Sequence, residues 1–253
     1  MNRVLFLGYK DCRILSFLKK QKGWSVFSTE DKISTSVLED IDPHLVVSYG
    51  YKTIIPKDVI SKIKDKAINL HISYLPWNRG IYPNLWSILD NTPKGVSIHM
   101  LDAGIDTGDL LYQKRVDFDN KETLSSSYEI LQEEIQDLFI ENWESIAKVN
   151  FRNIRKKQDK TIGSFHLRKE GDQVLKDLQI DNWEVSVSEV KSKQDVQIIN
   201  EIQAIRAKNN THWMDVVKLA FEIAPEEARD IFKKIKHCDF QINELLKELA
   251  END

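Results

Sequence analysis

The first half of the chain alternates short apolar runs with amphipathic segments, and this alternation restricts the chain to few folds. Each apolar run has the length of a buried strand, and six of them follow in order: Arg3–Gly8, Trp24–Phe27, Leu45–Ser48, Ala67–Leu70, Val96–Leu101 and Leu110–Phe118. Helical patterns separate them, with Asp11 expected to cap the first helix and Pro56 to begin a helix that runs to Ile63. Strands that alternate with helices pair mostly in parallel, and helices then cover both faces of the sheet. The sequence therefore predicts an α/β fold.

The pattern changes in the second half. One long amphipathic helix is predicted over Glu122–Lys148, because its apolar residues recur at steps of three and four. From Val196 onward four apolar stripes predict helices, with a helix start at Pro225 and a helix–turn–helix corner at Arg206–Trp213, for which a docking surface is the alternative. We divide the chain into an α/β domain at 1–165, short strands and a linker at 166–195, and a helical C-terminal appendix at 196–253.

Composition excludes several classes of partner. The chain has 36 Lys and Arg against 40 Asp and Glu, a net charge of −4, so no basic face for nucleic acid is expected. No apolar run approaches the roughly 20 residues of a membrane span, and Val4–Leu7 is too short for a signal peptide, so we expect a cytoplasmic protein without membrane contact. Cys12 and Cys238 stand far apart and outside any metal-binding spacing, so reduced thiols and no metal are expected.

Two polar stretches follow predicted strands and are candidates for chemistry. In Asn69–Gly80, the side chains of Asn69 and His71 are two residues apart and therefore share one face of a strand. The second stretch, His99–Asp109, contains glycines and three carboxylates just beyond the next strand. Open α/β sheets bind ligands at the carboxyl ends of their strands, so we expect the two stretches to meet in one site.

Structural explanations exist for each residue taken alone. A single Asn or His in a loop is usually structural, and aspartates often form turns or caps. A dinucleotide-binding dehydrogenase is another possibility for a sheet that begins this way, but the first strand ends in Gly8 alone and not in the pattern G-x-G-x-x-G. The combination of the two stretches, in this order, favours a shared catalytic site.

The order and spacing of these residues resemble the signature of folate-dependent formyltransferases, a family that includes the nucleotide-sugar N-formyltransferases. The resemblance covers residues 1–165 and rests on Asn69, His71, Ser73, Pro76, Arg79, Gly80, His99, Asp102, Asp106, Thr107 and Gly108. It implies a Rossmann-like domain that uses 10-formyltetrahydrofolate as co-substrate, needs no metal, and has Asn69, His71 and Asp106 as its catalytic residues. Asp102 and Asp109 do not align with the catalytic carboxylate.

The chemistry of formyl transfer explains these residue types. A neutral amine attacks the formyl carbon, and negative charge develops on the formyl oxygen, where Asn69 and a protonated His71 are suitable hydrogen-bond donors. The amine must then lose a proton, which His71 can relay because imidazole titrates near neutral pH. Asp106 would orient His71 or a water and favour the imidazolium.

The resemblance also assigns the binding residues. The residues expected against the folate are Tyr51, Ile54, Ile55, Asp102, Gly104 and Ile105. The residues expected against the amine substrate are Gly8, Tyr9, Lys10, Trp77, Asn78, Arg79, Tyr82 and Asn84. Aromatic and amide side chains suit a sugar, which offers hydroxyl groups and apolar ring faces.

The stretch Leu75–Ser87 is similar to the loop of sugar N-formyltransferases, and Gly163–His166 also resembles a segment of these enzymes. We therefore expect the substrate to be a nucleotide-linked amino sugar, formylated for surface polysaccharide such as lipopolysaccharide. A glycinamide ribonucleotide-like small amine is the alternative, followed by methionyl-tRNA, whose enzymes end in a β-barrel where this chain has acidic helices. Binding of the folate or nucleotide without turnover is a further alternative. So small a helical appendix cannot cover its own apolar stripes, so we expect it to dock on the α/β domain or on a second copy of the chain, and a homodimer is expected.

Overall fold

The computed structural model describes residues 1–251, with side chains throughout except at positions 246 and 248–251. The chain forms two compact units, Met1–Gln194 and Asp195–Asp253. The first unit contains every residue assigned above to catalysis or binding.

A six-stranded sheet in the order β2-β1-β3-β4-β6-β7 forms the centre of the first unit. Its strands are β1 Asn2–Gly8, β2 Trp24–Thr29, β3 Leu45–Tyr49, β4 Ala67–His71, β6 Gly95–Met100 and β7 Leu110–Arg115. The first four strands pair in parallel, whereas β6 is antiparallel to both β4 and β7. The prediction of a mostly parallel sheet is confirmed. A separate pair joins β5 Arg79–Gly80 to β8 Phe165–His166.

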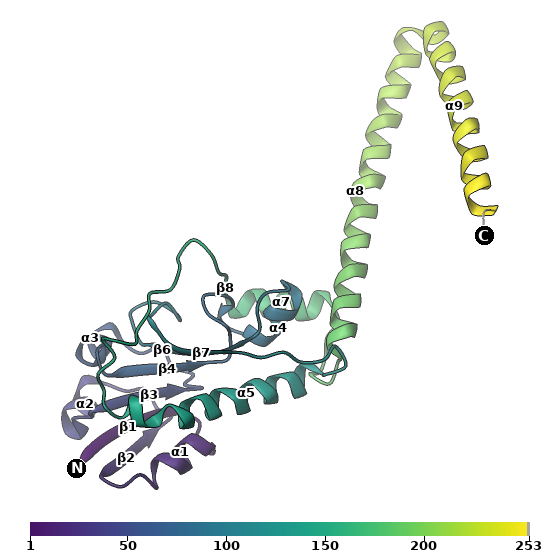
Figure 1. Ribbon diagram of the computed structural model, residues 1–253. Coiled ribbons are helices and arrows are strands. Elements are labelled where there is room, and N and C mark those ends of the chain that lie inside the picture. The colour runs from purple at the N-terminus through teal and green to yellow at the C-terminus, as the bar shows by residue number, and fades with distance from the viewer. Residues whose placement is uncertain (252–253) are drawn as a thin grey trace. The chain divides into compact units, whose positions relative to one another are not determined.

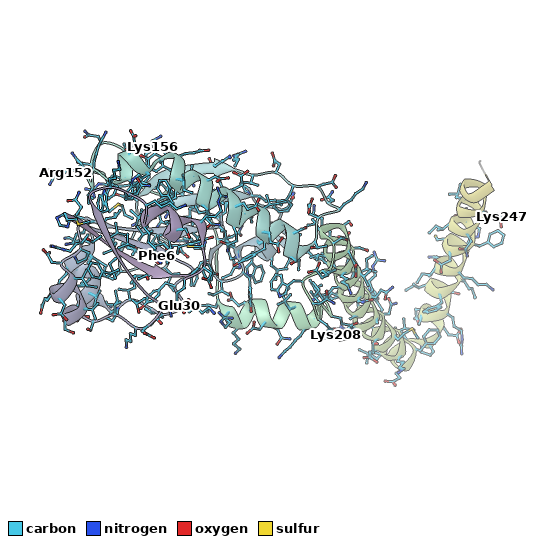
Figure 2. The ribbon with its side chains drawn as sticks, turned by 90° about the horizontal axis from the view of Figure 1, so that it is seen from below. Phe6, Glu30, Arg152, Lys156, Lys208 and Lys247 are labelled. Carbon is cyan, nitrogen blue, oxygen red and sulfur yellow. The ribbon has the colours of Figure 1, made fainter. Side chains whose placement is uncertain are left out.

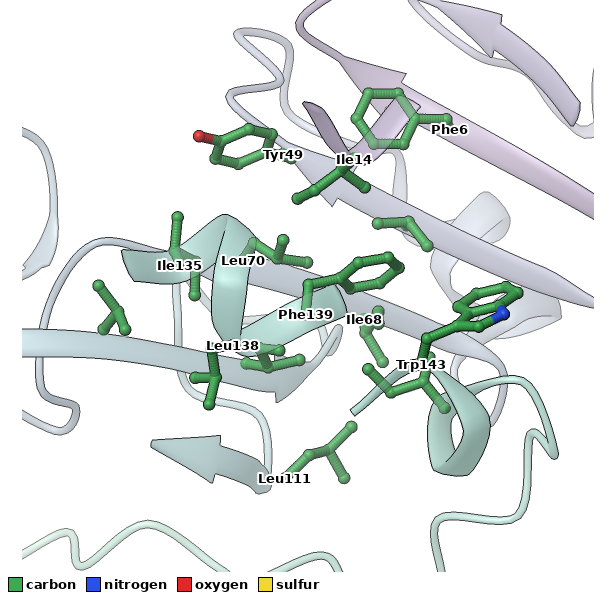
Figure 3. Close-up of a cluster of buried hydrophobic side chains, with 14 of the residues drawn as sticks. Phe6, Ile14, Tyr49, Ile68, Leu70, Leu111, Ile135, Leu138, Phe139 and Trp143 are labelled. Carbon is green, nitrogen blue, oxygen red and sulfur yellow. The ribbon is translucent and has the colours of Figure 1, made fainter. Parts of the chain in front are cut away.

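Helices cover both faces of this sheet, as predicted (Figure 1). One face packs against α1 Arg13–Leu18, α5 Leu124–Glu141 and α6 Trp143–Ile146, and the other against α2 Thr35–Ile41 and α3 Lys57–Ile63. Figure 3 shows Phe139 and Leu138 of α5 over Ile68 and Leu70 of β4, with Trp143 beside them. A fully buried side chain such as Phe139 contributes about 2 kcal/mol to stability.

A third apolar cluster attaches the residues after 163 to α4 Pro83–Leu89 and to Leu124 of α5. It joins α4 to Leu178, which follows α7 Arg168–Asp177, and to Val187 and Val190 at the start of α8. The segment after the sheet is thereby held against the loop that precedes α4.

Several local predictions were wrong. The first helix is capped by Cys12, whose sulfur accepts from the Leu15 amide, and not by Asp11. The helix predicted over Glu122–Lys148 breaks at Asn142, whose side chain returns to the Leu138 carbonyl. Helix α7 occupies the segment expected to form short strands. Gly171 lies inside this helix. A Cβ at this position would come within 2.4 Å of the Tyr82 ring, so the glycine allows the helix to pack closely against Tyr82.

The second unit consists of α8, Val187–Ile223, from Asp195 onward and of α9, Pro225–Glu251 (Figure 1). Pro225 starts a helix as predicted, but Arg206–Trp213 forms no corner, because α8 continues through it with Asn209 exposed. The last predicted apolar stripe includes Leu246 and Leu249, whose side chains lie outside the described part. No helix among the described residues is long and apolar enough to cross a membrane.

Candidate active site

Strand β4 places Asn69 and His71 at its carboxyl end. Their neighbours Ile68 and Leu70 belong to the apolar cluster on the opposite face, so Asn69 and His71 share the other face as predicted. Because β6 runs antiparallel to β4, its His99 lies directly opposite Asn69. The sheet register therefore places a second imidazole beside the predicted pair.

The third predicted residue, Asp106, reaches the same point from the loop between β6 and β7. Its backbone is left-handed, with a φ of 53°, a conformation that Asp tolerates better than most residues. The side-chain amide of Gln158 donates to the carbonyl oxygens of Asp106 and Gly108, each at 2.8 Å. The Gly80 amide donates to Asp106 Oδ2 at 2.9 Å. Two segments distant in sequence therefore fix Asp106, Gln158 at its backbone and Gly80 at its carboxylate.

Asn69 connects Asp106 to His99. Its Nδ2 donates to Asp106 Oδ1 at 3.2 Å and lies 3.1 Å from His99 Nε2. His99 Nδ1 lies 2.8 Å from the Met100 carbonyl, which can only accept, so Nδ1 carries a hydrogen and Nε2 of the neutral ring accepts from Asn69. Both amide hydrogens of Asn69 are thus used within the cluster.

His71 lies on the other side of the carboxylate. Its Nε2 is 3.1 Å from the Asn78 carbonyl, to which it must donate, and 3.7 Å from Asp106 Oδ2. In the neutral ring the lone pair is therefore on Nδ1, which can take up a proton. The resulting imidazolium would be stabilised by the adjacent carboxylate.

The electrostatic environment keeps Asp106 ionised. Burial by itself raises the pKa of this carboxyl, but the charge that His71 carries when protonated, the hydrogen bond and charge that His99 supplies when its Nε2 is protonated, and the Gly80 amide outweigh burial and hold the pKa well below its usual range. A buried carboxylate flanked by two imidazoles and an amide can orient a proton-transferring histidine. Within the described residues no group of three or more His, Cys, Asp or Glu has the arrangement of a metal site.

The residues predicted to contact the folate fall into two groups. Asp102 shapes its own loop, since its Oδ1 accepts from the Gly104 amide at 3.0 Å and from Thr107 Oγ1 at 2.7 Å. Tyr51 and Ile55 are half-buried against the apolar cluster of α2 and α3, and the Tyr51 hydroxyl donates to the Asp31 carbonyl. Two side chains remain free to cover an apolar ring: Ile54 is 82% exposed and Ile105 is 49% exposed.

Of the predicted amine-substrate residues at the end of β1, Tyr9 borders a cavity of about 410 Å³. Gly8 must be glycine there, because its φ is 124° and a Cβ would lie 1.8 Å from the Tyr49 carbonyl oxygen. Tyr9 packs edge-on against Tyr49, while Lys10 is exposed and pairs with Glu30 at 3.4 Å. The cavity is lined by Tyr9, Asp11, Cys12, Arg13, Tyr49, Tyr128, Gln132 and Gln136.

A larger cavity of about 500 Å³ lies elsewhere in the first unit. Its lining includes Asn2, His44 and Lys66, which are near the amino ends of strands, and none of the predicted site residues. Because open α/β sheets bind ligands at the opposite edge, the tyrosine-lined cavity is the better candidate for a substrate.

Two residues of the Trp77–Tyr82 loop and α4 have roles different from those predicted. Asn78 is 0% exposed and its side chain is bonded to Thr92 and Ser164, while Asn84 is 2% exposed and donates to the Leu124 carbonyl and to Ser127. In this conformation neither side chain can reach a substrate. Both instead hold the loop and α4 in place through the hydrogen bonds that their buried amides donate, and Asn84 Oδ1 is left without a partner among the described residues.

The other members of that loop are partly exposed. Trp77 and Arg79 are half-buried, and the Arg79 side chain donates to the Ser164 carbonyl at 3.3 Å. The Tyr82 hydroxyl donates to Asp172 at 2.8 Å.

His166 stacks on Trp86 with ring centres 4.0 Å apart, and burial lowers the pKa of His166 although Asp90 partly opposes this. The segment after 163 therefore supports the loop from outside.

Two contributors to the site were missed from the sequence. His99 lies on the same strand face as Ser97, and pairing β6 with β4 would have placed it opposite Asn69. Gln158 lies in the basic stretch before Lys160 and nothing in its sequence context marks it. Its position depends on the bridge between Leu110 and Lys156, which is a long-range contact.

Comparison with known proteins agrees with this geometry. A family model described as formyl transferase matches residues 9–142. The structure resembles the formyltransferase PseJ from Anoxybacillus kamchatkensis, solved with UDP-4,6-dideoxy-4-formamido-L-AltNAc and tetrahydrofolate, at 37% identity and a TM-score of 0.68, covering 75% of this chain and 97% of that one. A sugar N-formyltransferase from Shewanella shares the fold at 21% identity and a TM-score of 0.60, covering 75% and 86%.

Curated relatives in sequence include the methionyl-tRNA formyltransferase of Clostridium novyi. It is 30% identical over 154 residues, which make up 60% of this chain and 48% of that protein. The chain thus spans about half the length of this relative.

Proposed function

The chain belongs to the formyl transferase family, and from that premise we propose that it transfers a formyl group from 10-formyltetrahydrofolate to the primary amine of a nucleotide-linked amino sugar. One observation carries the chemistry: the ionised Asp106 lies between two imidazoles and the amide of Asn69 at the carboxyl edge of the sheet. The co-substrate supplies the activated formyl carbon, and the chain's own residues bind, orient and move protons.

His71 is the proposed proton carrier. Its Nε2 hydrogen is held by the Asn78 carbonyl, so an incoming amine proton can be accepted at Nδ1. The imidazolium formed in this way lies beside Asp106, whose charge stabilises it. The ring then returns the proton to the nitrogen that leaves the formyl group.

Asn69 is the proposed hydrogen-bond donor to the formyl oxygen, but both of its amide hydrogens are engaged in the structure. The contact with His99 is the one that a substrate can replace, because His99 keeps its second hydrogen bond to the Met100 carbonyl. Asp106 would continue to orient the amide. Donors that are fixed before the reaction are the ones that lower its barrier most.

The similarity to PseJ supports a nucleotide-sugar substrate. That protein was solved with a UDP-linked 4-formamido sugar, and it is covered over 97% of its length by this chain. The cavity beside Tyr9 has the size for a sugar or a base, and its tyrosine and glutamine side chains, together with Asp11 and Arg13, offer hydrogen-bonding groups to either. Ile54 and Ile105 remain the apolar side chains available to the folate.

Methionyl-tRNA is the second candidate, because tRNA-directed enzymes are among the curated relatives. A tRNA substrate calls for a basic surface. The chain has a net charge of −4, and the unit that follows the sheet has 12 Asp and Glu against 8 Lys and Arg. These charges favour the sugar.

The test is an assay of the purified protein with 10-formyltetrahydrofolate and a set of amines, with formylated products detected by mass spectrometry. The set contains UDP- and dTDP-linked amino sugars with the amine at carbon 3 or 4, glycinamide ribonucleotide and charged initiator tRNA. We expect turnover with a UDP-linked 4-amino sugar, slowed by on the order of a hundredfold or more in a His71→Asn variant. Turnover only with tRNA would contradict the sugar assignment, and no turnover with any amine would contradict transfer itself.

A further inference from the structure

The second unit exposes far more apolar surface than the first. Of the large apolar side chains that are exposed among the described residues, 16 lie in 195–251 and 9 in the 194 residues before it. Figure 2 shows side chains on all sides of these helices. Monomeric proteins rarely expose continuous apolar patches of more than a few hundred Å². This surface therefore calls for a partner.

One set of apolar residues of α9 repeats with the period of a coiled coil. Its members follow one another at alternating steps of three and four: Ala228, Ile231, Ile235, Cys238, Ile242 and Leu245. A seven-residue repeat keeps one stripe facing a neighbouring helix, which packs its side chains into the spaces between them. We call this stripe, with its counterpart on α8, the seam.

Helix α8 carries the same repeat in two stretches. The first is Ile198, Ile202 and Ile205, and the second is Val216, Leu219 and Ile223. Asn209 and His212 continue the same steps between them, so the seam has two successive polar layers. Polar residues at such positions set the register and number of helices in a coiled coil at some cost in stability.

We propose that the second unit is an interface between two copies of this chain, in which the seams of α8 and α9 pack against those of the second copy. Ten of the sixteen side chains lie on the seam and most of them are about half exposed, so the seam presents on the order of 1,000 Å² of apolar surface, comparable to the roughly 800 Å² per partner of a standard interface. The proposal is independent of which amine the catalytic unit formylates.

A second copy fits this surface better than other occupants. A seam with a regular repeat is complementary to itself, so an identical helix is a suitable neighbour. The exposed apolar residues of the first unit, from Met1 to Trp183, are scattered along its sequence and form no repeat. The charges of the second unit are mixed, 12 acidic and 8 basic, which suits neither nucleic acid nor an anionic membrane.

Part of this chain has no counterpart in PseJ. Three quarters of this chain account for 97% of that protein, so about a quarter of this chain has no counterpart in it. The second unit has that size. An added unit with an unpartnered seam is therefore a feature of this chain and not a part of the formyltransferase fold.

The experiment measures the molar mass of the full-length protein by light scattering and sedimentation velocity at micromolar concentrations. We expect a dimer, and a dissociation constant at least a hundredfold higher for Ile242→Glu, because each copy would bury an unpaired charge in the seam. The matched control is Phe240→Glu. Phe240 is 63% exposed against 53% for Ile242, but it lies off the seam, so this variant should remain a dimer.

A second pair of variants, on α8, keeps the test decisive if an α9 variant fails to fold. Ile202→Glu lies in the seam and Met214→Glu does not, and circular dichroism follows the helix content of each. A monomeric wild type would overturn the proposal, as would equal effects of seam and control variants. Monomeric protein that sediments with phosphatidylcholine–phosphatidylserine vesicles would assign the surface to a membrane instead.

Discussion

The two units of this chain differ in which side chains they bury. In the first unit even polar side chains are buried and hydrogen-bonded: Asn78 and Asn84 donate to neighbouring segments, and Asp106 is held by Asn69, Gly80 and Gln158. In the second unit even large apolar side chains are exposed, among them Trp213 and Ile223. The first unit is complete in itself, whereas the second presents surface that a complete domain would bury.

This difference has a physical consequence. Most helical stability in proteins comes from packing of an apolar face, and isolated helices are marginal in water. The sheet supplies that packing for α5, but no described contact supplies it along the exposed stripes of α8 and α9. Substitutions in the first unit should therefore change the reaction rate, and substitutions in the second unit should change the molar mass.

The largest expected effect is at His71. Replacing His71 with Asn removes the proton carrier while keeping a polar side chain, so kcat should fall by on the order of a hundredfold or more. Steady-state kinetics measure the rate, and light scattering should show an unchanged molar mass. A loss of less than about threefold would exclude His71 from proton transfer, given that general acid–base residues contribute far more.

Asp106→Asn should lower kcat by a similar order while leaving folate affinity nearly unchanged, because the charge that stabilises the imidazolium is lost. Asp109→Asn is the control, since Asp109 only faces Arg155 at 3.8 Å. An inactive Asp109 variant beside an active Asp106 variant would show that the wrong carboxylate has been assigned.

The same variant tests the electrostatics of the site. The pKa of Asp106 is lowered in the folded state, so its ionisation stabilises the fold above the unfolded pKa of about 3.9. This stability is lost as the pH falls through the lower folded-state pKa. The difference in free energy of unfolding between wild type and Asp106→Asn should therefore shrink below about pH 4, which denaturant titrations at several pH values can measure.

Gln158→Ala should have a smaller effect on the same unit. It removes two hydrogen bonds to the Asp106 and Gly108 carbonyls, each worth about 1 kcal/mol, so kcat/KM should fall about tenfold. The control is Gln173→Ala on α7, where the side chain bonds only to Asp177. Equal activity of the two variants would show that the Asp106 turn holds its shape without Gln158.

The sequence predicted the sheet and the shared strand face of Asn69 and His71 for related reasons. Apolar runs of strand length and the two-residue spacing of Asn69 and His71 are local features, and local spacing fixes which face a side chain shares. His99 and Gln158 depend on the partners that their segments meet, which β-pairing decides over 30 and 52 residues of separation. Long-range pairing is not encoded in local periodicity.

The incorrect predictions have the same origin. Asn78 and Asn84 were assigned to the substrate because amides suit sugars, but their burial depends on Ser164, Thr92 and Leu124. The corner at Arg206–Trp213 was predicted from its polar residues. In α8 two of these residues, Asn209 and His212, form the polar positions of a continuous seam. Polar residues of a seam and polar residues of a turn look alike in a single sequence.

Ending the chain at Gln194 separates the two units. The catalytic unit contains all proposed site residues, so kcat and KM should stay within about threefold of wild type, in the range of surface changes remote from chemistry. The molar mass should fall to that of a monomer. Lost affinity for the sugar with an unchanged oligomer would instead make the second unit a recognition element.

The smallest expected effect concerns the thiol of Cys238. This cysteine lies in the seam of α9 and is exposed in the single chain, whereas Cys12 is half-buried in the first unit and caps α1. Because thiol reagents need access to the sulfur, Cys238 should react slowly in the dimer and several-fold faster in the Ile242→Glu variant. Cys12 should react at the same rate in both proteins, so it serves as the internal control. Mass spectrometry after timed labelling measures both sites in one sample. If Cys238 reacts equally fast in the two proteins while the molar mass of the wild type is that of a dimer, the copies associate through another face and the proposed seam is not the interface.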